Sequence, residues 1–500
     1  PKYWCTSNAR DIMPFFDSVL LAVLVFVLLW LLSRKQSRQM CLPPGPTGLP
    51  LVGNLFQLDR KAPYKSVVKL SESYGPVIMV NTGLQRVVFL IGYDAVKEAL
   101  VDHADDFIGR GPLPFLVKIT RGLVISNGER WRQLRQFTLS TLRDFGMGRK
   151  GMEQWIQEES THLVERIKTM KGEPFDPTFF LSCSVSNIIC CLVFGERFSY
   201  DDKHFLRLLQ HISQILILIS SPWAVLYNIF PRLMEWLPGG HQKAFKRIEE
   251  LRKFVIEKVK EHEDTLDPNS PRDYIDCFLT RAIKEKGTST EFHNDNLVST
   301  VFNMYMGGTE STSSTIRFAL NVFIKYPKIQ ERMQQEIDNV IGQERFPFME
   351  DRKSLPFVDA VLHEVQRFMD FAPLGAPHYA LHNITFRGYT IPKGTMIFPV
   401  LYSVLKEGKQ WATPFLFNPQ HFLDHNDNFK KNPAFLPFSA GKRACVGESL
   451  ARMEIFLFLV KLLQHFTFSC PGGPDSIELT PEFSSFANVH RRYNIIATPR

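Results

Sequence analysis

Cys445 lies in a ten-residue segment that restricts the fold of this chain more than any other feature. The segment reads Phe438-Ser439-Ala440-Gly441-Lys442-Arg443-Ala444-Cys445-Val446-Gly447. A cysteine that ligates a metal must stay a thiolate, so its sulfur needs backbone N–H donors, a nearby cation and a position that a flat macrocycle can approach. We expect Gly441 and Gly447 to permit the tight turns, Arg443 to supply the charge, and Phe438 to cover the sulfur from water.

The remaining cysteines do not suggest cross-links or zinc binding. The chain has 8 cysteines, two of them adjacent, and contains no C-x-x-C motif. That pattern fits neither a disulfide framework nor a zinc site. Most free cysteines are small buried hydrophobic residues. We expect this role for the four that lie in apolar helical stretches, namely Cys183, Cys190, Cys191 and Cys277.

Composition favours one large body with a mild positive charge. The sequence has no linker rich in Pro, Gly or Ser, so residues 41–500 are expected to form a single domain. A hydrophobic share of 44% with 42 phenylalanines is ample for a core and an oily cavity. The net charge of +8 is not clustered into arms. It therefore fits a membrane surface or an acidic protein partner better than nucleic acid.

The segment 1–40 is predicted to be a membrane anchor with a basic flank. Residues 14–32 carry only one charge, Asp17, and are followed by Arg34, Lys35 and Arg38. About 20 apolar residues span a bilayer, and the basic cluster places the following chain in the cytosol. A cleaved signal peptide is the alternative, but no small-residue cleavage site follows Leu32. The proline-rich residues 41–46 then form a stiff extended connector.

The periodicity of the sequence predicts a mostly helical fold with a small β region. A hairpin is expected at 77–80 and 87–90 around Gly83, and strands at 385–389 and 396–400. Helices are expected at 129–142, 151–169, 179–194, 205–218, 241–261, 294–325, 326–341, 355–369 and 448–464. Ser354 is the expected cap of the 355–369 helix.

The helix expected at 294–325 has an unusual centre. Pro327 ends it, and its middle reads Gly307-Gly308-Thr309-Glu310-Ser311-Thr312. Two glycines and several hydroxyls within a helical pattern predict a local kink or groove. Such a patch is more often a packed kink than a catalytic site.

A second short pattern, Glu364-Val365-Gln366-Arg367, places an acid and a base on one helical face. Isolated pairs of this kind are common on surfaces and contribute little. Here the pair precedes the Cys445 segment by about 80 residues, with Pro419-Gln420-His421-Phe422 between them.

The chain resembles the cytochrome P-450 monooxygenases. The resemblance lies in the order of five features: the anchor, the proline connector, the central helix, the Glu364/Arg367 pair and the Cys445 segment. The resemblance covers essentially the whole chain. The stretches 181–197 and 365–367 are similar to the vertebrate microsomal family two, in particular its J subfamily. His421 departs from many families, which carry arginine there, and this weakens the expectation of a three-charge cluster.

The resemblance implies a haem b cofactor with Cys445 as its axial thiolate ligand. The residues expected to bind the haem and its two propionates are Arg110, Trp131, Arg135, His378, Phe438, Arg443 and Cys445. Arginine forks and indole N–H groups suit carboxylates. Glu364 and Arg367 would be structural supports behind the haem.

The resemblance also implies an oxygen-activating group and a lipophilic pocket. Glu310, Ser311 and Thr312 would handle protons; Ser311 stands where the family usually has threonine, and it lacks the methyl group that restricts the side chain. The pocket would draw on 112–124, 214–226, 302–311, 371–377 and Phe486. Its named members are Phe115, Phe302, Met306, Gly307, Leu374 and Phe486.

By the same resemblance, the protein would oxygenate fatty acids, steroids or xenobiotics at the endoplasmic reticulum membrane. Electrons would come from NADPH through cytochrome P-450 reductase, with a microsomal b-type cytochrome as a second donor, because the chain has no nucleotide-binding motif. Two alternatives stay open at this point: a haem-thiolate isomerase or dehydratase of lipid peroxides, and a non-enzymatic haem sensor. Glu310 with Ser311 favours the monooxygenase, since enzymes that rearrange peroxides often lack that pair.

Overall fold

Helices form most of this structure, a computed structural model that describes residues 41–500 except 51, 146–149, 288–289 and 485. The helices are α2 (Pro63–Tyr74), α3 (Tyr93–Lys97), α4 (Pro114–Ile119), α5 (Gly128–Asp144), α6 (Lys150–Lys168), α7 (Thr178–Phe194), α8 (Lys203–Ile219), α9 (Pro222–Ile229), α10 (Pro231–Trp236), α11 (Gly240–Thr265), α12 (Tyr274–Lys284), α13 (Asn294–Lys325), α14 (Pro327–Val340), α15 (Pro356–Met369), α16 (Leu401–Leu405) and α17 (Glu448–His465). The predicted long helices are confirmed within a few residues at each end.

The β region consists of short strands in four small sheets. They are β1 (Val77–Thr82), β2 (Gln85–Leu90), β3 (His378–Tyr379), β4 (Ile384–Phe386), β5 (Tyr389–Ile391), β6 (Met396–Pro399), β7 (Phe466–Ser469), β8 (Pro481–Ser484), β9 (Asn488–His490) and β10 (Ile496–Pro499). The largest sheet has the order β1-β2-β6-β3, with β2 and β6 parallel and Val87 opposite Met396. The pairs β7/β10, β4/β5 and β8/β9 are antiparallel.

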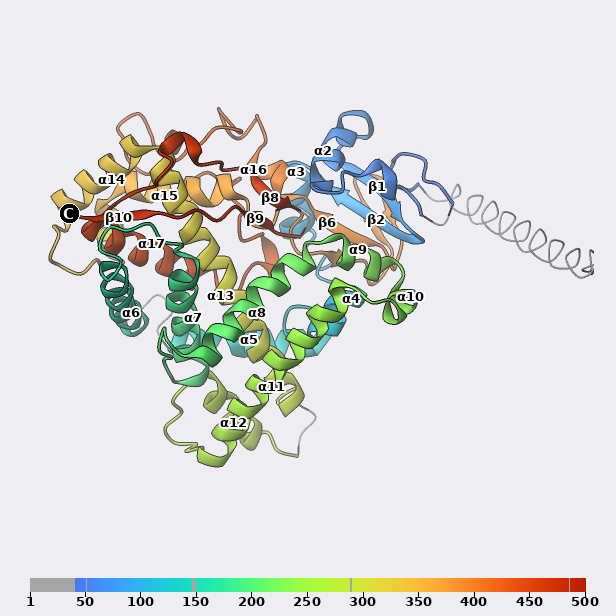
Figure 1. Ribbon diagram of the computed structural model, residues 1–500. Helices are drawn as coiled ribbons and strands as arrows, with labels where there is room; N and C mark the ends of the chain where they lie inside the picture. The colour runs from blue at the N-terminus through green and yellow to red at the C-terminus, as the bar shows by residue number, and fades with distance from the viewer. Residues whose placement is uncertain (1–40, 51, 146–149, 288–289, 485) are drawn as a thin grey trace, which may run out of the picture.

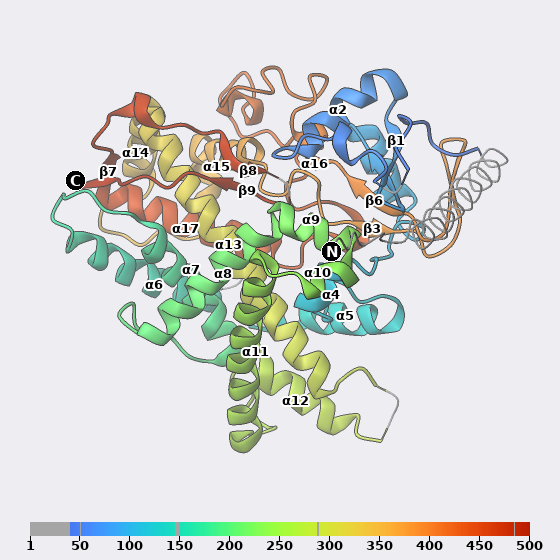
Figure 2. The same cartoon turned by 45° about the vertical axis from the view of Figure 1, so that its right-hand side comes forward.

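Helix α13 crosses the centre of the molecule. Figures 1 and 2 show it between the four-stranded sheet with α2 at one end and β7, β10 and α14 at the other. It packs against α7, α11, α15 and α17. Helix α7 is apolar around most of its circumference and mostly buried, as expected for a core helix. Helix α13 is therefore the central helix around which the others pack.

Helix α13 continues without interruption from 294 to 325, so its two central glycines do not break it, and the kink or groove expected there stays a prediction. Gly308 instead permits close packing with α7. A Cβ on Gly308 would lie 2.5 Å from the Cδ1 atom of Ile189, so any side chain there would force the two helices apart. Gly307 has no atom within 4 Å of an equivalent Cβ and faces open space.

Three further expectations are settled by the fold. Residues 385–389 are not one strand but belong to the β4/β5 hairpin, whose turn holds Arg387 and Gly388 at positive φ of 50° and 80°. Ser354 does not cap α15, which starts after Leu355 without a side-chain cap. The four apolar-helix cysteines are buried or half-buried, as predicted.

The predicted membrane anchor lies outside the described residues. Within the part of the chain that the structure describes, no single helix is long and apolar enough to span a membrane. The bent pair of α8 and α9 reaches the required length and composition only when the two helices are taken together, with a 62° bend between them.

Candidate functional site

The Cys445 segment forms a tight loop that leads into α17. It starts with a 3₁₀ turn, η5 (Gly441–Arg443). Gly441 has a φ of 71°, and a Cβ there would lie 1.8 Å from the carbonyl oxygen of Leu100, so only glycine fits. Gly447 has an ordinary φ of −93° as the residue before α17. The predicted need for glycine is thus confirmed at 441, whereas at 447 the backbone conformation does not require it.

Backbone donors converge on the Cys445 sulfur. Burial, with the charge of Glu448, raises the pKa of the Cys445 thiol overall, while the backbone N–H groups of Gly447 and Glu448 and the charge of Arg135 partly offset this. Protein surrounds the residue, yet its side chain keeps accessible surface. A bound metal ion would displace the thiol proton, so the setting suits a ligand that is a thiolate only when coordinated.

Arg135, not Arg443, is the cation beside the sulfur. The Nη2 atom of Arg135 donates to the carbonyl oxygen of Ala444 at 2.7 Å. The Arg443 guanidinium instead lies over the Trp131 ring, 4.1 Å from its centroid, and donates to the carbonyl oxygens of Ile108 and Ser126. Phe438 accepts the Cys445 N–H on its carbonyl oxygen at 3.1 Å, and the covering of the sulfur by its ring stays a prediction.

The structure brings the predicted propionate-binding residues Arg110, Trp131, Arg135, His378 and Arg443 together. Burial and the charge of Arg135 lower the pKa of Arg110 to about 10, and burial with both neighbouring guanidinium groups lowers the pKa of Arg443 to about 9. Burial and the charge of Arg110 lower the pKa of His378 well below its ordinary value, so this imidazole is neutral. Its Nδ1 atom contacts the carbonyl oxygen of Phe107.

The guanidinium groups of Arg110, Arg135 and Arg443 repel one another. None of them takes part in an ion pair among the described residues. The buried Nε atom of Arg110 has no hydrogen-bond partner in the described part of the chain. An unpaired buried donor and three clustered cations are costly unless an anion joins them. The donor set therefore fits a ligand with two carboxylates.

Asn127 is a member of this cluster that the sequence reasoning missed. Its Oδ1 atom accepts from the Arg110 backbone N–H at 2.7 Å and from Arg443 Nη2 at 3.3 Å. The sequence signal was an Asn-Gly step directly before α5, which usually marks a helix cap. Here the side chain makes no cap hydrogen bond and instead holds two arginines.

Ser311 shares the open face of α13 with Gly307. Its Oγ atom donates to the Gly307 carbonyl oxygen at 2.7 Å. Met306 and Gly307 also keep accessible surface. A hydroxyl that bonds back to the fourth preceding carbonyl can switch to another acceptor by rotating about one bond. Ser311 is therefore placed to donate a proton to a group that lies against this face.

Glu310 points to a different side of the helix. It is 7% exposed, and its Oε1 atom accepts from Ser314 Oγ at 3.3 Å and from Ser213 Oγ at 3.5 Å. Burial raises the pKa of Glu310, and the charges of Arg317 and Arg492 partly offset this. Its carboxyl group therefore keeps a proton to higher pH than an exposed glutamate does, which favours a role in proton transfer.

Thr312 lies away from the open face that Ser311 shares with Gly307, so its expected catalytic role stays a prediction. It is buried, and its side chain lies near the carboxyl group of Glu454 on α17. Successive helical side chains differ in direction by about 100°, so Ser311 and Thr312 cannot face the same ligand. Sequence reasoning missed Glu454, because its position in an apolar helix gives no local signal.

The predicted pocket residues divide into two groups. Met306, Gly307, Leu374 and Phe486 keep accessible surface. Phe115 and Phe302 are 1% and 2% exposed and pack in the core of this structure, so their place in the pocket lining stays a prediction. The ring of Phe115 packs between Tyr227 and Phe245. Its apolar character serves the packing of α4 against α9 and α11.

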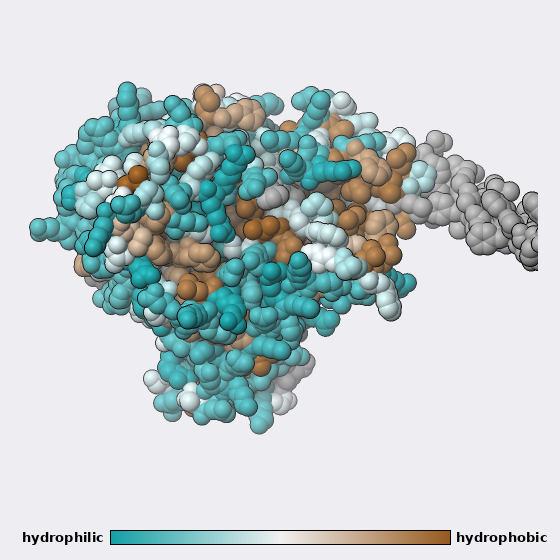
Figure 3. Space-filling view, viewed as in Figure 1, coloured by the Kyte–Doolittle hydropathy of each residue, from teal (hydrophilic) through white to brown (hydrophobic). Residues whose placement is uncertain are grey.

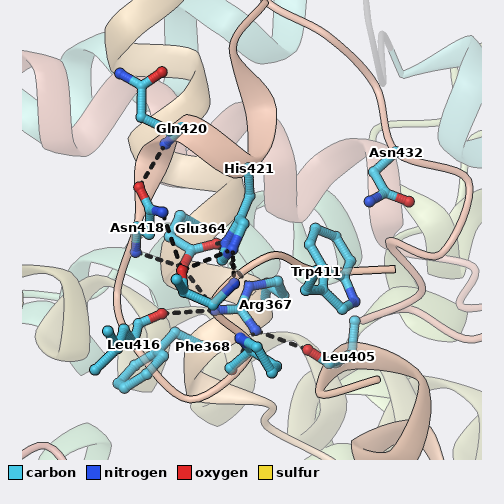
Figure 4. Close-up of polar contacts among 12 residues, drawn as sticks. Glu364, Arg367, Phe368, Leu405, Trp411, Leu416, Asn418, Gln420, His421 and Asn432 are labelled. Atoms are coloured by element: carbon cyan, nitrogen blue, oxygen red, sulfur yellow. Dashed lines mark hydrogen bonds and ion pairs between the residues drawn. The ribbon is translucent and has the colours of Figure 1, made fainter. Parts of the chain in front are cut away.

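Glu364 and Arg367 form a fully buried, bidentate ion pair with both contacts at 2.7 Å. Figure 4 shows Arg367 donating onward to the carbonyl oxygens of Leu405 and Leu416. The Asn418 N–H donates to Glu364. The pair is thus a structural support that ties α15 to the loop before the Cys445 segment, as its predicted structural role requires.

His421 completes this cluster as a hydrogen-bond donor. Its Nδ1 atom lies 3.2 Å from Glu364 Oε2, and its Nε2 atom accepts the Thr413 N–H at 3.1 Å (Figure 4). Because Nε2 accepts, the proton is on Nδ1 and is donated to Glu364. A neutral imidazole therefore stands in this cluster where many families carry arginine.

Comparisons with known proteins agree with this geometry. A model of the cytochrome P450 family matches residues 43–496. The chain belongs to the cytochrome P450 family. Cytochrome P450 2F3 of Capra hircus is 47% identical over 97% of this chain and 100% of its own length. Cytochrome P450 2G1 of Oryctolagus cuniculus is 47% identical over 97% and 98%, and cytochrome P450 2C23 of Rattus norvegicus is 46% identical over 94% and 95%.

Membership in the P450 family makes the protein a monooxygenase of the microsomal family two. P450 enzymes bind haem through a cysteine thiolate and use a redox partner, O₂ and a lipophilic substrate. The relatives named above carry the subfamily letters F, G and C. The similarity to the J subfamily therefore stays a prediction.

Proposed function

We propose that Cys445 is the axial thiolate of this P450 and that the protein inserts one oxygen atom of O₂ into a lipophilic substrate. The observation that carries the assignment is the convergence of two backbone N–H groups and Arg135 on one accessible sulfur. The three-arginine cluster lies beside the same loop. Among the cysteines of residues 41–500, only Cys445 has these neighbours.

Haem bound at this site supplies the activation of O₂, and the chain supplies positioning and protons. Arg110, Arg135 and Arg443 would bind the two propionates, with the Trp131 N–H as a further donor and neutral His378 as a polar neighbour. Their mutual repulsion falls when two negative charges are bound. The same residues would then fix the orientation of the haem relative to Ser311.

Ser311 would donate the proton that oxygen activation consumes, and Glu310 would replace it. The Ser311 hydroxyl needs only to leave the Gly307 carbonyl oxygen, 2.7 Å away, to reach an acceptor on the open face. Thr312 is buried and lies beside Glu454, away from the open face, so we do not assign it this role. Retention of an acid and a hydroxyl at 310 and 311 supports the monooxygenase over a peroxide isomerase or a haem sensor.

The substrate class is proposed to be fatty acids, steroids or lipophilic xenobiotics. The accessible side chains at Met306, Leu374 and Phe486 are apolar. A lining of this kind favours lipophilic molecules and does not discriminate among their shapes. The electrons would come from NADPH through cytochrome P450 reductase, with a microsomal b-type cytochrome as a further partner.

The catalytic domain, residues 41–500, is proposed to lie on the cytosolic face of the endoplasmic reticulum membrane, held by the anchor in 1–40. Exposed large apolar side chains on and beside α9 and α10 support contact with lipid; they are Trp223, Phe230, Leu233 and Trp236. Figure 3 shows apolar surface in this region and near the adjoining sheet. Such a patch is unusual on a protein surrounded only by water.

Reconstitution with the reductase tests the proposal. Purified haem-loaded protein mixed with reductase, NADPH and a lipid extract should form oxygenated products that depend on each of these three additions and on O₂. Product formation from a lipid peroxide without NADPH would indicate the isomerase. Haem binding without any turnover under both conditions would indicate the sensor.

A further inference from the structure

Two histidines from distant parts of the chain meet one aspartate at the surface. His103 and Asp106 lie in the turn that follows residues 98–102, and His382 lies between β3 and β4. Asp106 Oδ2 is 3.7 Å from His103 Nδ1, and Asp106 Oδ1 is 3.1 Å from His382 Nε2. The side chains of His103, Asp106 and His382 are 45%, 41% and 57% exposed. Solvent and its ions can therefore reach all three groups.

The charge of the Asp106 carboxylate is not paired with a lysine or arginine within the described chain, where its ion pairs are with these two imidazoles. The neighbouring acids have basic partners instead. Asp105 pairs with Lys442 at 2.5 Å, and Glu98 pairs with Arg387 at 2.6 Å. A neutral imidazole offers a nitrogen lone pair but no positive charge. One negative charge and two nitrogen ligands are therefore available together to a cation.

Backbone contacts hold the two segments beside each other. The Tyr379 N–H donates to the Gly109 carbonyl oxygen at 2.9 Å, and His378 Nδ1 contacts the Phe107 carbonyl oxygen. The His103 ring meets the Phe386 ring edge-on, with the ring centroids 5.9 Å apart. The fold, rather than the three exposed side chains, therefore sets the distance between the turn and the segment that carries His382.

The spacing of these groups suits a tetrahedral zinc ion. Nitrogen and oxygen ligands bind zinc at about 2.0–2.2 Å, so two ligands at tetrahedral corners lie roughly 3.3–3.6 Å apart. The two nitrogen-to-oxygen distances, 3.1 and 3.7 Å, bracket this spacing. The half-exposed imidazoles can rotate towards one ion, and water can take the fourth position. Calcium and magnesium prefer sites made of oxygen ligands alone, so a pair of imidazoles selects against them.

A more compact cluster between α11 and α12 suits a metal ion less well. His262, Asp273 and Asp276 are buried, and their ligand atoms lie within 4.8 Å of one another. Arg272 already pairs with Asp276 at 2.6 Å, and His262 pairs with Asp273 at 2.7 Å. A metal ion there would have to break existing buried ion pairs, which is costly. A cation at Asp106 displaces no lysine or arginine.

We propose that His103, Asp106 and His382 form a zinc site that clamps the turn at 103–106 to the segment between β3 and β4. The same turn is joined to the Cys445 loop through the ion pair of Asp105 with Lys442. Zinc would therefore tie together two chain segments on which the haem site is built. Because only the folded chain brings the three ligands together, bound zinc should stabilise the native state.

Equilibrium dialysis of untagged, haem-loaded protein against Zn²⁺ tests the site. The parent should bind one more equivalent of zinc than His103→Gln, Asp106→Asn or His382→Gln, and excess calcium should not displace it. His211→Gln is the matched control and should keep the zinc content of the parent, because His211 also lies beside a carboxylate, that of Glu250 at 2.8 Å, but outside this site. Equal zinc contents in the parent and the three site variants would overturn the proposal. Loss of the equivalent in His211→Gln would do so as well, since it would show adventitious zinc only.

X-ray absorption at the zinc edge identifies the ligands, because haem iron absorbs at a different energy. A first shell of nitrogen and oxygen atoms is expected. Sulfur in that shell would place the zinc on a cysteine such as the exposed Cys41 and would overturn the proposal.

Thermal unfolding tests the clamp. At a free zinc concentration roughly 100 times the dissociation constant, the midpoint of the parent should rise by about 2–3 °C. The three site variants should show no rise, and a chelator should reverse the rise in the parent. A zinc-dependent rise that persists in His382→Gln would contradict the clamp, because that variant cannot join the two segments through the metal ion.

Discussion

The side chain of Thr312 lies beside the carboxyl group of Glu454 on α17, and both residues are buried. Burial raises the pKa of Glu454 well above its ordinary value, so this acid is neutral. The contact ties the centre of α13 to the helix that follows Cys445. It also leaves Ser311 as the hydroxyl on the open face of α13 at this level.

The two neighbouring hydroxyls should therefore respond differently to mutation. Ser311→Ala should divert reducing equivalents to hydrogen peroxide, and Ser311→Thr should keep oxidation and improve coupling, because threonine has fewer rotamers. Thr312→Val should leave the coupling ratio nearly unchanged but lower the free energy of unfolding by about 1–2 kcal/mol. The measurement is product per NADPH with one substrate. Full coupling in Ser311→Ala with poor coupling in Thr312→Val would reverse the assignment.

Breaking the buried pair behind the site should cost far more stability than removing its imidazole partner. Arg367→Met leaves the Glu364 carboxylate buried without its ion pair, and we expect a loss of about 3–5 kcal/mol in the free energy of unfolding. His421→Ala removes a neutral donor and should cost about 1–2 kcal/mol. Denaturant unfolding of both variants checks the order. Equal losses would show that His421 is charged in the cluster.

A buried ion pair between α11 and α12 should make stability depend on pH. His262 Nε2 lies 2.7 Å from Asp273 Oδ2, and Nδ1 donates to the Lys258 carbonyl oxygen. Burial alone would lower the pKa of His262, but the hydrogen bond and charge of Asp273, this carbonyl and the charge of nearby Asp276 raise it overall. Arg272 pairs with Asp276 at the same site.

The sign follows from the raised pKa. Between the ordinary pKa of about 6.5 and the raised folded-state pKa, the folded protein holds a proton that the unfolded chain has lost, so stability falls as the pH rises. The contribution is fully present below pH 6.5 or so. Unfolding free energies of the parent and His262→Gln should thus differ most at low pH and converge at high pH. A difference that is constant with pH would contradict this.

The orientation of the domain can be read from one glycosylation sequence. Asn383-Ile384-Thr385 is an acceptor by sequence, and Asn383 is exposed, with its Oδ1 atom accepting only the Lys393 N–H among the described residues. A cytosolic domain would not meet the transferase, so Asn383 should carry no glycan in protein from animal cells. Mass spectrometry checks this. A glycan at Asn383 would overturn the cytosolic assignment. Because Asn383 is exposed, burial would not explain the absence of a glycan.

Local patterns predicted the long elements well because their signals lie within the element. The limits of α13 agree with the prediction of 294–325, where helical periodicity ends shortly before Pro327. The β4/β5 hairpin was not predicted. Its turn is at Arg387-Gly388, where both residues take positive φ, and Gly388 is the local signal for such a turn.

The site could be predicted only where a short motif fixes it. Cys445 and Gly441 are constrained by their own loop, and the loop conformation agrees with the sequence interpretation. Which arginine lies beside the sulfur depends on how α5 packs against that loop, which is why Arg135 was confused with Arg443. The pocket lining is harder to predict, because apolar character alone cannot distinguish a core position such as Phe115 from a pocket wall.

The absorption spectrum of the reduced, CO-bound protein tests the central claim most directly. Cys445→Ala should lose the red-shifted carbonyl band that a thiolate ligand gives, whereas the control Cys41→Ala, which changes an exposed cysteine, should keep it. Persistence of that band in Cys445→Ala would contradict the assignment of Cys445 as the haem ligand.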